Sequence, residues 1–208
     1  FGDLDYEHDE NEKKWNNFDS ILNVFKKLID QGKIRYIGLS NETPWGLSKF
    51  LQIADEKKLP RIVSVQNPYN LVNRSYEIGM SEISIREKAG LLAYSPLAAG
   101  YLTGKYRNNQ IPKNSRMDLF YENYPRYHND RTYSAVDEYF NIAKKNKMSL
   151  TQLSQAFVNS RDFVTSNIIG ATTMSQLKEN IDSINISLND EILNHINLVH
   201  EKIPNPAP

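Results

Sequence analysis

Short apolar segments alternate with segments of helical periodicity along this chain, and that alternation limits its possible folds more than any other feature. Each short segment is bounded by Gly, Pro, Asn or Ser, which is typical of a buried strand. The strands predicted in this way cover residues 34–39, 62–65, 91–94 and 163–169. Strands that alternate with helices form parallel sheets with right-handed crossovers, so the pattern predicts an α/β fold. A doubly wound sheet and a (β/α)8 barrel both fit it.

Capping residues mark where the intervening helices begin and end. Gly32 is a natural stop for the first helix, and Thr43-Pro44 supplies an N-cap and a first-turn proline for the second. The segments Ser149–Gln152 and Thr173–Gln176 have the pattern of capping boxes, so each is expected to open a helix. Further helices are predicted over residues 75–88, 133–147 and 190–201, and the first helix over 15–29.

Two segments are predicted to be loops. Residues 1–14 are acidic and polar. Residues 100–131 contain Pro112, Pro125, several Asn and many aromatic residues. A loop of this length inside a compact domain is usually functional or mobile.

The composition narrows the range of partners. The chain has 208 residues, with 25 basic and 25 acidic side chains, so no net field attracts it to nucleic acid or to an anionic membrane. No apolar segment reaches the roughly 18 residues of a membrane span. Cys is absent, which fits a reducing compartment, and we expect a cytoplasmic protein. The chain does not begin with Met, so we expect a fragment or a processed product.

Polar and small residues follow each predicted strand. They are Ser40-Asn41, Gln66-Asn67, Tyr94-Ser95 and Gly170-Ala171-Thr172. The carboxyl ends of parallel strands lie at one edge of a sheet, and (β/α)8 barrels build their sites there. After the third strand, Ala98, Ala99 and Gly100 form a small-residue loop followed by Gly104-Lys105, which suits close approach to an anion. No Gly-x-Gly-x-x-Gly follows a strand, which counts against a Rossmann dinucleotide site.

Four segments around these strand ends together resemble the aldo-keto reductase family, in the branch that contains bacterial Tas-like reductases and potassium-channel β subunits. The segments are Gly32–Asn41, Val65–Asn70, Tyr94–Tyr106 and Ile169–Asn180. They are similar to the fifth to eighth strands of that family, in the right order and spacing. The resemblance implies a partial (β/α)8 TIM barrel of four C-terminal βα units, strands 5–8, with a C-terminal helix, in a single domain over residues 1–208.

The resemblance also implies NADPH-dependent reduction of a small carbonyl substrate, an aldehyde or a ketone, and it assigns the cofactor contacts. Ser40, Asn41 and Gln66 are expected to bind the nicotinamide carboxamide, because an amide needs both donors and acceptors. Tyr94 is expected to stack on the nicotinamide ring. The remaining contacts are the pyrophosphate-lining Ser95, Pro96, Leu97, Ala99 and Gly100, the phosphate-binding Lys105 and Arg116, and the adenosine-binding Gly170, Thr172, Gln176, Glu179 and Asn180.

Three of these assignments have a simpler structural alternative. Gln176 could be only a capping residue, Lys105 only a surface charge, and Arg116 only part of a solvated loop with its neighbours Asp118, Glu122 and Arg126. Trp45 and Tyr69 are expected in the core or at its rim. The histidines lack metal-ligand spacing, so no metal site is predicted and all are expected to be solvated; they are His8, His128, His195 and His200.

The family's catalytic Asp, Tyr, Lys and His come from the first half of its barrel, and no residue here matches them. The chain alone is therefore expected to be inactive. A half barrel has two open strand edges, which favours self-association or pairing with an N-terminal half. Two other functions stay open: a non-catalytic NADPH-binding regulatory subunit, and an unrelated βα-barrel lyase or isomerase.

Overall fold

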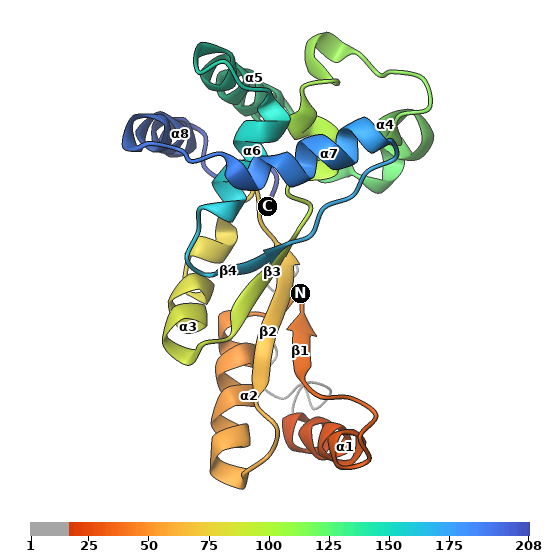
Figure 1. Cartoon of the computed structure of the whole chain (residues 1–208), viewed down its shortest axis with the longest axis vertical. Helices are drawn as coiled ribbons and strands as arrows, with labels where there is room; N and C mark the ends of the chain where they lie inside the picture. The colour runs from red at the N-terminus through yellow and green to blue at the C-terminus, as the bar shows by residue number, and fades with distance from the viewer. Residues whose placement is uncertain (1–16) are drawn as a thin grey trace. The chain divides into compact units, whose positions relative to one another are not determined.

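A computed structural model describes residues 17–208, which form two compact units. The first unit contains residues 17–67 and 79–92, and the second contains residues 68–78 and 93–208. The chain crosses between the units at three points, two of which lie inside strands. Figure 1 shows the elements in chain order. The prediction of one domain over the whole sequence remains a prediction.

The first unit combines three helices with strands of the sheet. Its elements are α1 (Phe18–Asp30), β1 (Ile37–Ser40), α2 (Pro44–Lys57), most of β2 (Ile62–Pro68), α3 (Met80–Glu87) and the start of β3 (Gly90–Tyr94). Thr43 caps α2, because its Oγ1 accepts a hydrogen bond from the Gly46 backbone N–H at 3.1 Å. Phe18 meets the Phe50 ring edge-on at 4.7 Å, which packs α1 against α2. The start of α2 predicted at Thr43-Pro44 is confirmed.

β1 and β2 pair in parallel, and the register shifts after the first pair. Ile37 lies opposite Ile62, whereas Gly38 lies opposite Ser64. A Cβ on Gly38 would stand only 2.5 Å from the Ser64 Oγ, so this crossing needs a glycine. The pairing ends with Ser40 opposite Gln66, which sets two predicted site residues side by side.

The second unit is built around α6. Its elements are α4 (Arg116–Phe120), α5 (Asp130–Lys145), α6 (Leu150–Asn159), β4 (Val164–Asn167), α7 (Met174–Asp182) and α8 (Asp190–Lys202), joined by short 3₁₀ turns. Eight side chains of α6 are buried, from Leu150 to Val158. The predicted Ser149–Gln152 capping box is present at its start. In the part of the chain that the structure covers, no helix combines the length and the apolar character needed to cross a membrane.

The sheet has the strand order β1-β2-β3-β4, and the α/β class with a parallel sheet is confirmed. Within the second unit, the Tyr69 N–H donates to the Tyr94 carbonyl at 3.2 Å, which extends the pairing of β2 with β3. The Ile168 N–H donates to the Ala93 carbonyl at 2.8 Å, beside β4.

Three element predictions need correction. The helix expected over residues 75–88 is two pieces, a 3₁₀ turn over Ser75–Glu77 and then α3, because Gly79 has a φ of +80°. The first strand begins at Ile37 rather than at residue 34. The fourth strand is shorter than 163–169 and covers only Val164–Asn167. Phe163, just before it, packs into the core against Tyr69 with ring centroids 5.2 Å apart.

The segment 100–131 contains α4 and several 3₁₀ turns, with Asp118, Glu122 and Arg126 exposed as predicted. Tyr69 is a core residue, and Trp45 lies at the rim with 61% of its surface exposed. The loop predicted over residues 1–14 and the predicted helical residue Trp15 lie outside the described residues, as does His8.

Candidate functional site

The three residues predicted to bind the nicotinamide carboxamide lie together in the first unit, at the carboxyl ends of β1 and β2. Ser40 and Gln66 face each other in the register, and both are exposed. The Asn41 N–H donates to the Gln66 carbonyl at 2.9 Å. Asn41 has a φ of +55°, a left-handed conformation that Asn tolerates better than most residues. The chain therefore turns sharply out of β1 and leaves the Ser40 hydroxyl and the Gln66 amide at the strand ends.

Asn67 holds this turn in place, a role that was not predicted from the sequence. Its Oδ1 accepts from the Glu42 N–H at 3.1 Å, and its Nδ2 donates to the Glu42 carbonyl at 2.9 Å. Only 7% of its surface is exposed, so both bonds are shielded from water. The Asn67 amide thus forms the hydrogen bonds that a neighbouring backbone would otherwise form with Glu42. The only signal in the sequence is its position next to Gln66 at the end of a strand.

The small-residue loop after β3 has an unusual backbone. Ser95, Ala98 and Ala99 all have φ values near +50°, and Gly100 has a φ of +102°. A left-handed alanine costs roughly 1–2 kcal/mol, so the surrounding structure must impose this conformation. Strained backbone of this kind gathers at ligand-binding loops.

Lys105 folds back over this loop. A Cβ added to Gly100 would stand 3.0 Å from the Lys105 Cε and 3.3 Å from its Nζ. The ammonium group also lies 5.1 Å from the centre of the Tyr106 ring. The glycine thus makes room for a lysine that carries positive charge to the backbone of the loop. Pro96 is buried and Leu97 half-buried within the same segment.

Tyr94 is half-buried at the end of β3, and burial raises its pKa, with Arg126 acting in the opposite direction. Its phenol is therefore neutral near neutral pH. Arg116 is exposed at the start of α4, and its Nη1 donates to the Tyr124 hydroxyl at 3.2 Å.

The predicted adenosine-binding residues lie around the N-terminus of α7, in the second unit. The Gln176 Oε1 accepts from the backbone N–H and from the hydroxyl of Thr172, at 2.9 and 3.0 Å. The capping box predicted for Thr173–Gln176 is therefore wrong, because the Gln176 side chain reaches one residue beyond Thr173. The Thr173 hydroxyl still caps the helix by accepting from the Gln176 N–H at 3.3 Å.

Asn180 and Glu179 have partners within the protein. Asn180 is buried, and its Nδ2 donates to the Gly170 carbonyl at 3.2 Å while its Oδ1 accepts from Gln155 at 3.2 Å. Glu179 accepts from the Ser149 hydroxyl at 2.5 Å, which ties α7 to the start of α6.

Two histidines expected to be solvated are partly buried. His128 stacks on Tyr121 with ring centroids 3.6 Å apart, and burial lowers its pKa. Burial also lowers the pKa of His200. His195 is half-exposed, with its Nδ1 2.8 Å from the Glu191 carbonyl oxygen. Among residues 17–208, no group of His, Asp and Glu side chains is arranged to hold a metal ion.

The α/β fold and the polar residues at the carboxyl ends of its parallel strands agree with a match to a known family. Residues 3–201 match the family model described as the Aldo/keto reductase family, and the chain belongs to this family. It is 45% identical over 192 residues to Protein tas of Escherichia coli strain K12, covering 91% of this chain and 55% of that protein.

Two further relatives come from eukaryotes. An aldo-keto reductase of Babesia bovis is 38% identical over 192 residues, covering 89% of this chain and 67% of the relative. A probable voltage-gated potassium channel subunit beta of Oryza sativa subsp. japonica is 33% identical over 184 residues, covering 85% of this chain and 56% of the relative. The chain thus spans from about half to two thirds of the length of these relatives.

Proposed function

We propose that this chain is the cofactor-binding part of an NADPH-dependent aldo-keto reductase that acts on an aldehyde or a ketone. Its family membership and its similarity to proteins named as reductases support an oxidoreductase. The observation that carries the finer proposal is the loop after β3, where Lys105 lies over Gly100 and several residues adopt left-handed backbone.

Residues of each unit suit one part of a dinucleotide, the carboxamide in the first unit and the pyrophosphate in the second. The room at Gly100 and the nearby Lys105 ammonium suit an anion, and the exposed Ser40 and Gln66 offer donors and acceptors for a carboxamide. Tyr94 supplies a flat neutral ring for stacking. Thr172 and Gln176 stand at the N-terminus of α7, where negative charge is favoured. When bound, the cofactor would supply the hydride for carbonyl reduction.

We further propose that the four strands correspond to strands 5–8 of a (β/α)8 barrel, which needs eight. The catalytic Asp, Tyr, Lys and His would then be supplied by a separate segment. The chain alone would bind NADPH without reducing a carbonyl, and it would self-associate or pair with an N-terminal half. A cytoplasmic location fits this assignment.

The second candidate is a non-catalytic NADPH-binding regulatory subunit. The similarity to a relative named as a potassium-channel β subunit favours it. The two candidates share the same cofactor site and differ in turnover.

NADPH binding is tested by quenching of Tyr and Trp fluorescence in the full 208-residue chain. Lys105→Met should weaken binding by roughly tenfold or more, because one charge-assisted contact is lost. Lys113→Met, which changes an exposed lysine of the same segment, is the control and should leave the affinity unchanged. Equal affinities of the two variants would contradict the phosphate role of Lys105. Consumption of NADPH with an aldehyde by the chain alone would contradict the proposed inactivity.

A further inference from the structure

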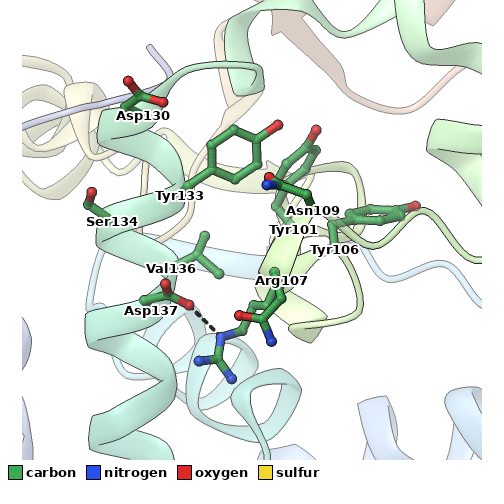
Figure 2. A pocket seen from close by; sticks show the side chains of 10 residues that line it. Tyr101, Tyr106, Arg107, Asn109, Asp130, Tyr133, Ser134, Val136 and Asp137 are labelled. Carbon is green, nitrogen blue, oxygen red and sulfur yellow. Dashed lines mark hydrogen bonds and ion pairs between the residues drawn. The ribbon is translucent and has the colours of Figure 1, made fainter.

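A cavity of about 370 Å³ lies in the second unit, between the first turns of α5 and the 3₁₀ turn Arg107–Asn109. Figure 2 shows Tyr133 and Val136 reaching into it from α5, opposite Asn109. None of the residues predicted to contact NADPH is among the described residues that line it. The volume falls in the range of small-molecule sites, so the cavity is large enough for an organic ligand.

A smaller hollow of about 140 Å³ adjoins the cavity. The two share Tyr101, Tyr106, Asn109 and Tyr133, and the smaller one adds apolar walls from Ile111 and Met117. Among the described residues, charged side chains line only the larger cavity, and they are Arg107, Asp130 and Asp137. The larger cavity thus offers charged groups, and the neighbouring hollow offers two apolar side chains, which suits a charged molecule with one apolar substituent.

Three of the four shared lining residues are tyrosines, and Tyr101 is held in place by packing. Tyr101 is 3% exposed, with its ring centroid 5.0 Å from Tyr106 and 5.4 Å from Tyr127. Burial raises the pKa of Tyr101, and a hydrogen bond with Tyr133 adds to the effect. The Tyr101 phenol therefore stays protonated. The faces of aromatic rings are electron-rich and attract organic cations.

The charged side chains that line the cavity also favour a cation. Arg107 is already engaged, because its Nε donates to Asp137 at 2.5 Å and its Cζ lies 3.6 Å from the centre of the Phe140 ring. Asp130 has no hydrogen bond or ion pair from its side chain within residues 17–208. Two carboxylates and one guanidinium leave the lining with one net negative charge, and Asp130 carries it.

We propose that this cavity binds a small organic ammonium ion with an aryl or alkyl substituent. The ammonium lies near Asp130 and the ring of Tyr133, and the substituent points toward Ile111 and Met117. An anionic ligand is disfavoured, because Arg107 would first have to leave both Asp137 and Phe140. The site is independent of the proposed cofactor function and requires none of its residues.

The probe is 2-phenylethylammonium, titrated into the full chain by calorimetry. Its neutral isostere 2-phenylethanol and the anion 3-phenylpropanoate are the comparison ligands. The ammonium should bind saturably, with the alcohol about tenfold weaker and the anion weaker still, since one ion pair of about 1.4 kcal/mol is worth a factor of ten. No saturable binding of the ammonium, or equal binding of the alcohol, would overturn the proposal.

A matched pair of variants tests the role of Asp130. Asp130→Asn should weaken ammonium binding by about tenfold. Asp190→Asn is the control, because Asp190 also begins a helix directly after an Asn cap, in α8, but lines neither hollow. Tyr133→Leu should weaken binding while Tyr133→Phe retains it, because the ring face is the contact. Equal affinities of the Asp130 and Asp190 variants, both shown folded by circular dichroism, would refute the site.

Discussion

Single residues set the backbone beside the predicted carboxamide-binding residues and in the predicted pyrophosphate-binding loop. Asn67 closes the turn after β1 with two hydrogen bonds to Glu42, and Gly100 makes room for Lys105. These residues act through geometry that only a structure reveals. Gln66, Gly100 and Lys105 could be proposed from the sequence, because their residue types and positions suit a cofactor. Asn67 could not, because the sequence does not show that its amide bonds to the backbone of a distant residue.

Replacing Asn67 should loosen the turn. Asn67→Leu leaves the Glu42 N–H and carbonyl without their partner, and an unpaired buried polar group costs about 1–3 kcal/mol. Urea unfolding measures the loss, and NADPH affinity should fall with it. Gln52→Leu, which changes an exposed amide of α2, is the control and should have little effect. A stability unchanged by Asn67→Leu would show that the two bonds contribute nothing.

Gly100→Ala should damage the phosphate-binding loop by crowding as well as by backbone strain. The new Cβ would meet Lys105 at 3.0 Å and Tyr106 at 3.2 Å, and the φ of +102° is unfavourable for alanine. Gly32→Ala separates the two effects, because Gly32 has a φ of +69° and no atom within 4 Å of the new Cβ. We expect about 1–3 kcal/mol of strain at Gly100. NADPH titration should show weaker binding only for Gly100→Ala.

Elements of the second unit are joined by a partly buried ionic cluster. The Arg74 guanidinium donates to both Glu77 oxygens, at 2.9 and 2.8 Å, and to Asn197 of α8 at 3.0 Å. The Tyr69 hydroxyl donates to the same carboxylate. The cluster fixes the 3₁₀ turn Ser75–Glu77 to α8.

The cluster gives the second unit a stability that depends on pH. Burial alone would raise the pKa of Glu77, but hydrogen bonds from Arg74 and Tyr69 outweigh it and lower the pKa. A carboxyl with a depressed pKa stabilises the fold above its unfolded pKa of about 4.3, and that stability is lost as the pH falls through the folded pKa.

Glu77→Gln should therefore lower the free energy of unfolding at neutral pH by about 3 kcal/mol, because Arg74 loses its partner. The difference from the unaltered chain should shrink as the pH falls below about 4. Urea titrations over a pH series measure it, with Glu82→Gln on exposed α3 as the control. A difference that stays constant with pH would contradict the assignment.

Across the whole molecule, features set by neighbouring residues could be predicted from the sequence, whereas contacts between distant segments could not. The strand–helix alternation, the caps at Thr43 and Ser149 and the family motifs depend on neighbouring residues, and the sequence predicted them. The break at Gly79 was missed, because a glycine within a helical pattern is often tolerated. The cavity beside α5 and the docking of the last residues depend on segments far apart in the chain, which no periodicity reveals.

The C-terminal segment closes the second unit. The Ala207 N–H donates to the Val72 carbonyl at 3.1 Å, and the Pro206 carbonyl accepts from Asn129 and Thr132 at the start of α5, each at 3.2 Å. Asn205 accepts from the Arg74 N–H at 2.7 Å. Ala207 is fully buried.

Removing residues 204–208 should destabilise the second unit by about 2–4 kcal/mol, since several buried hydrogen bonds are lost together. Removing only the exposed Pro208 is the control and should change little. Thermal unfolding followed by circular dichroism measures both. Equal melting temperatures for the two truncations would show that the docked segment contributes nothing to stability.

The pairing of Asn67 with Glu42 also bears on chemical ageing. Asparagine deamidates when the backbone nitrogen of the next residue attacks the side-chain amide, and that attack requires an N–H. The residue after Asn67 is Pro68, whose nitrogen carries no hydrogen. The amide that closes the turn is thereby protected from conversion to a carboxylate, and the turn should keep its shape throughout the lifetime of the protein.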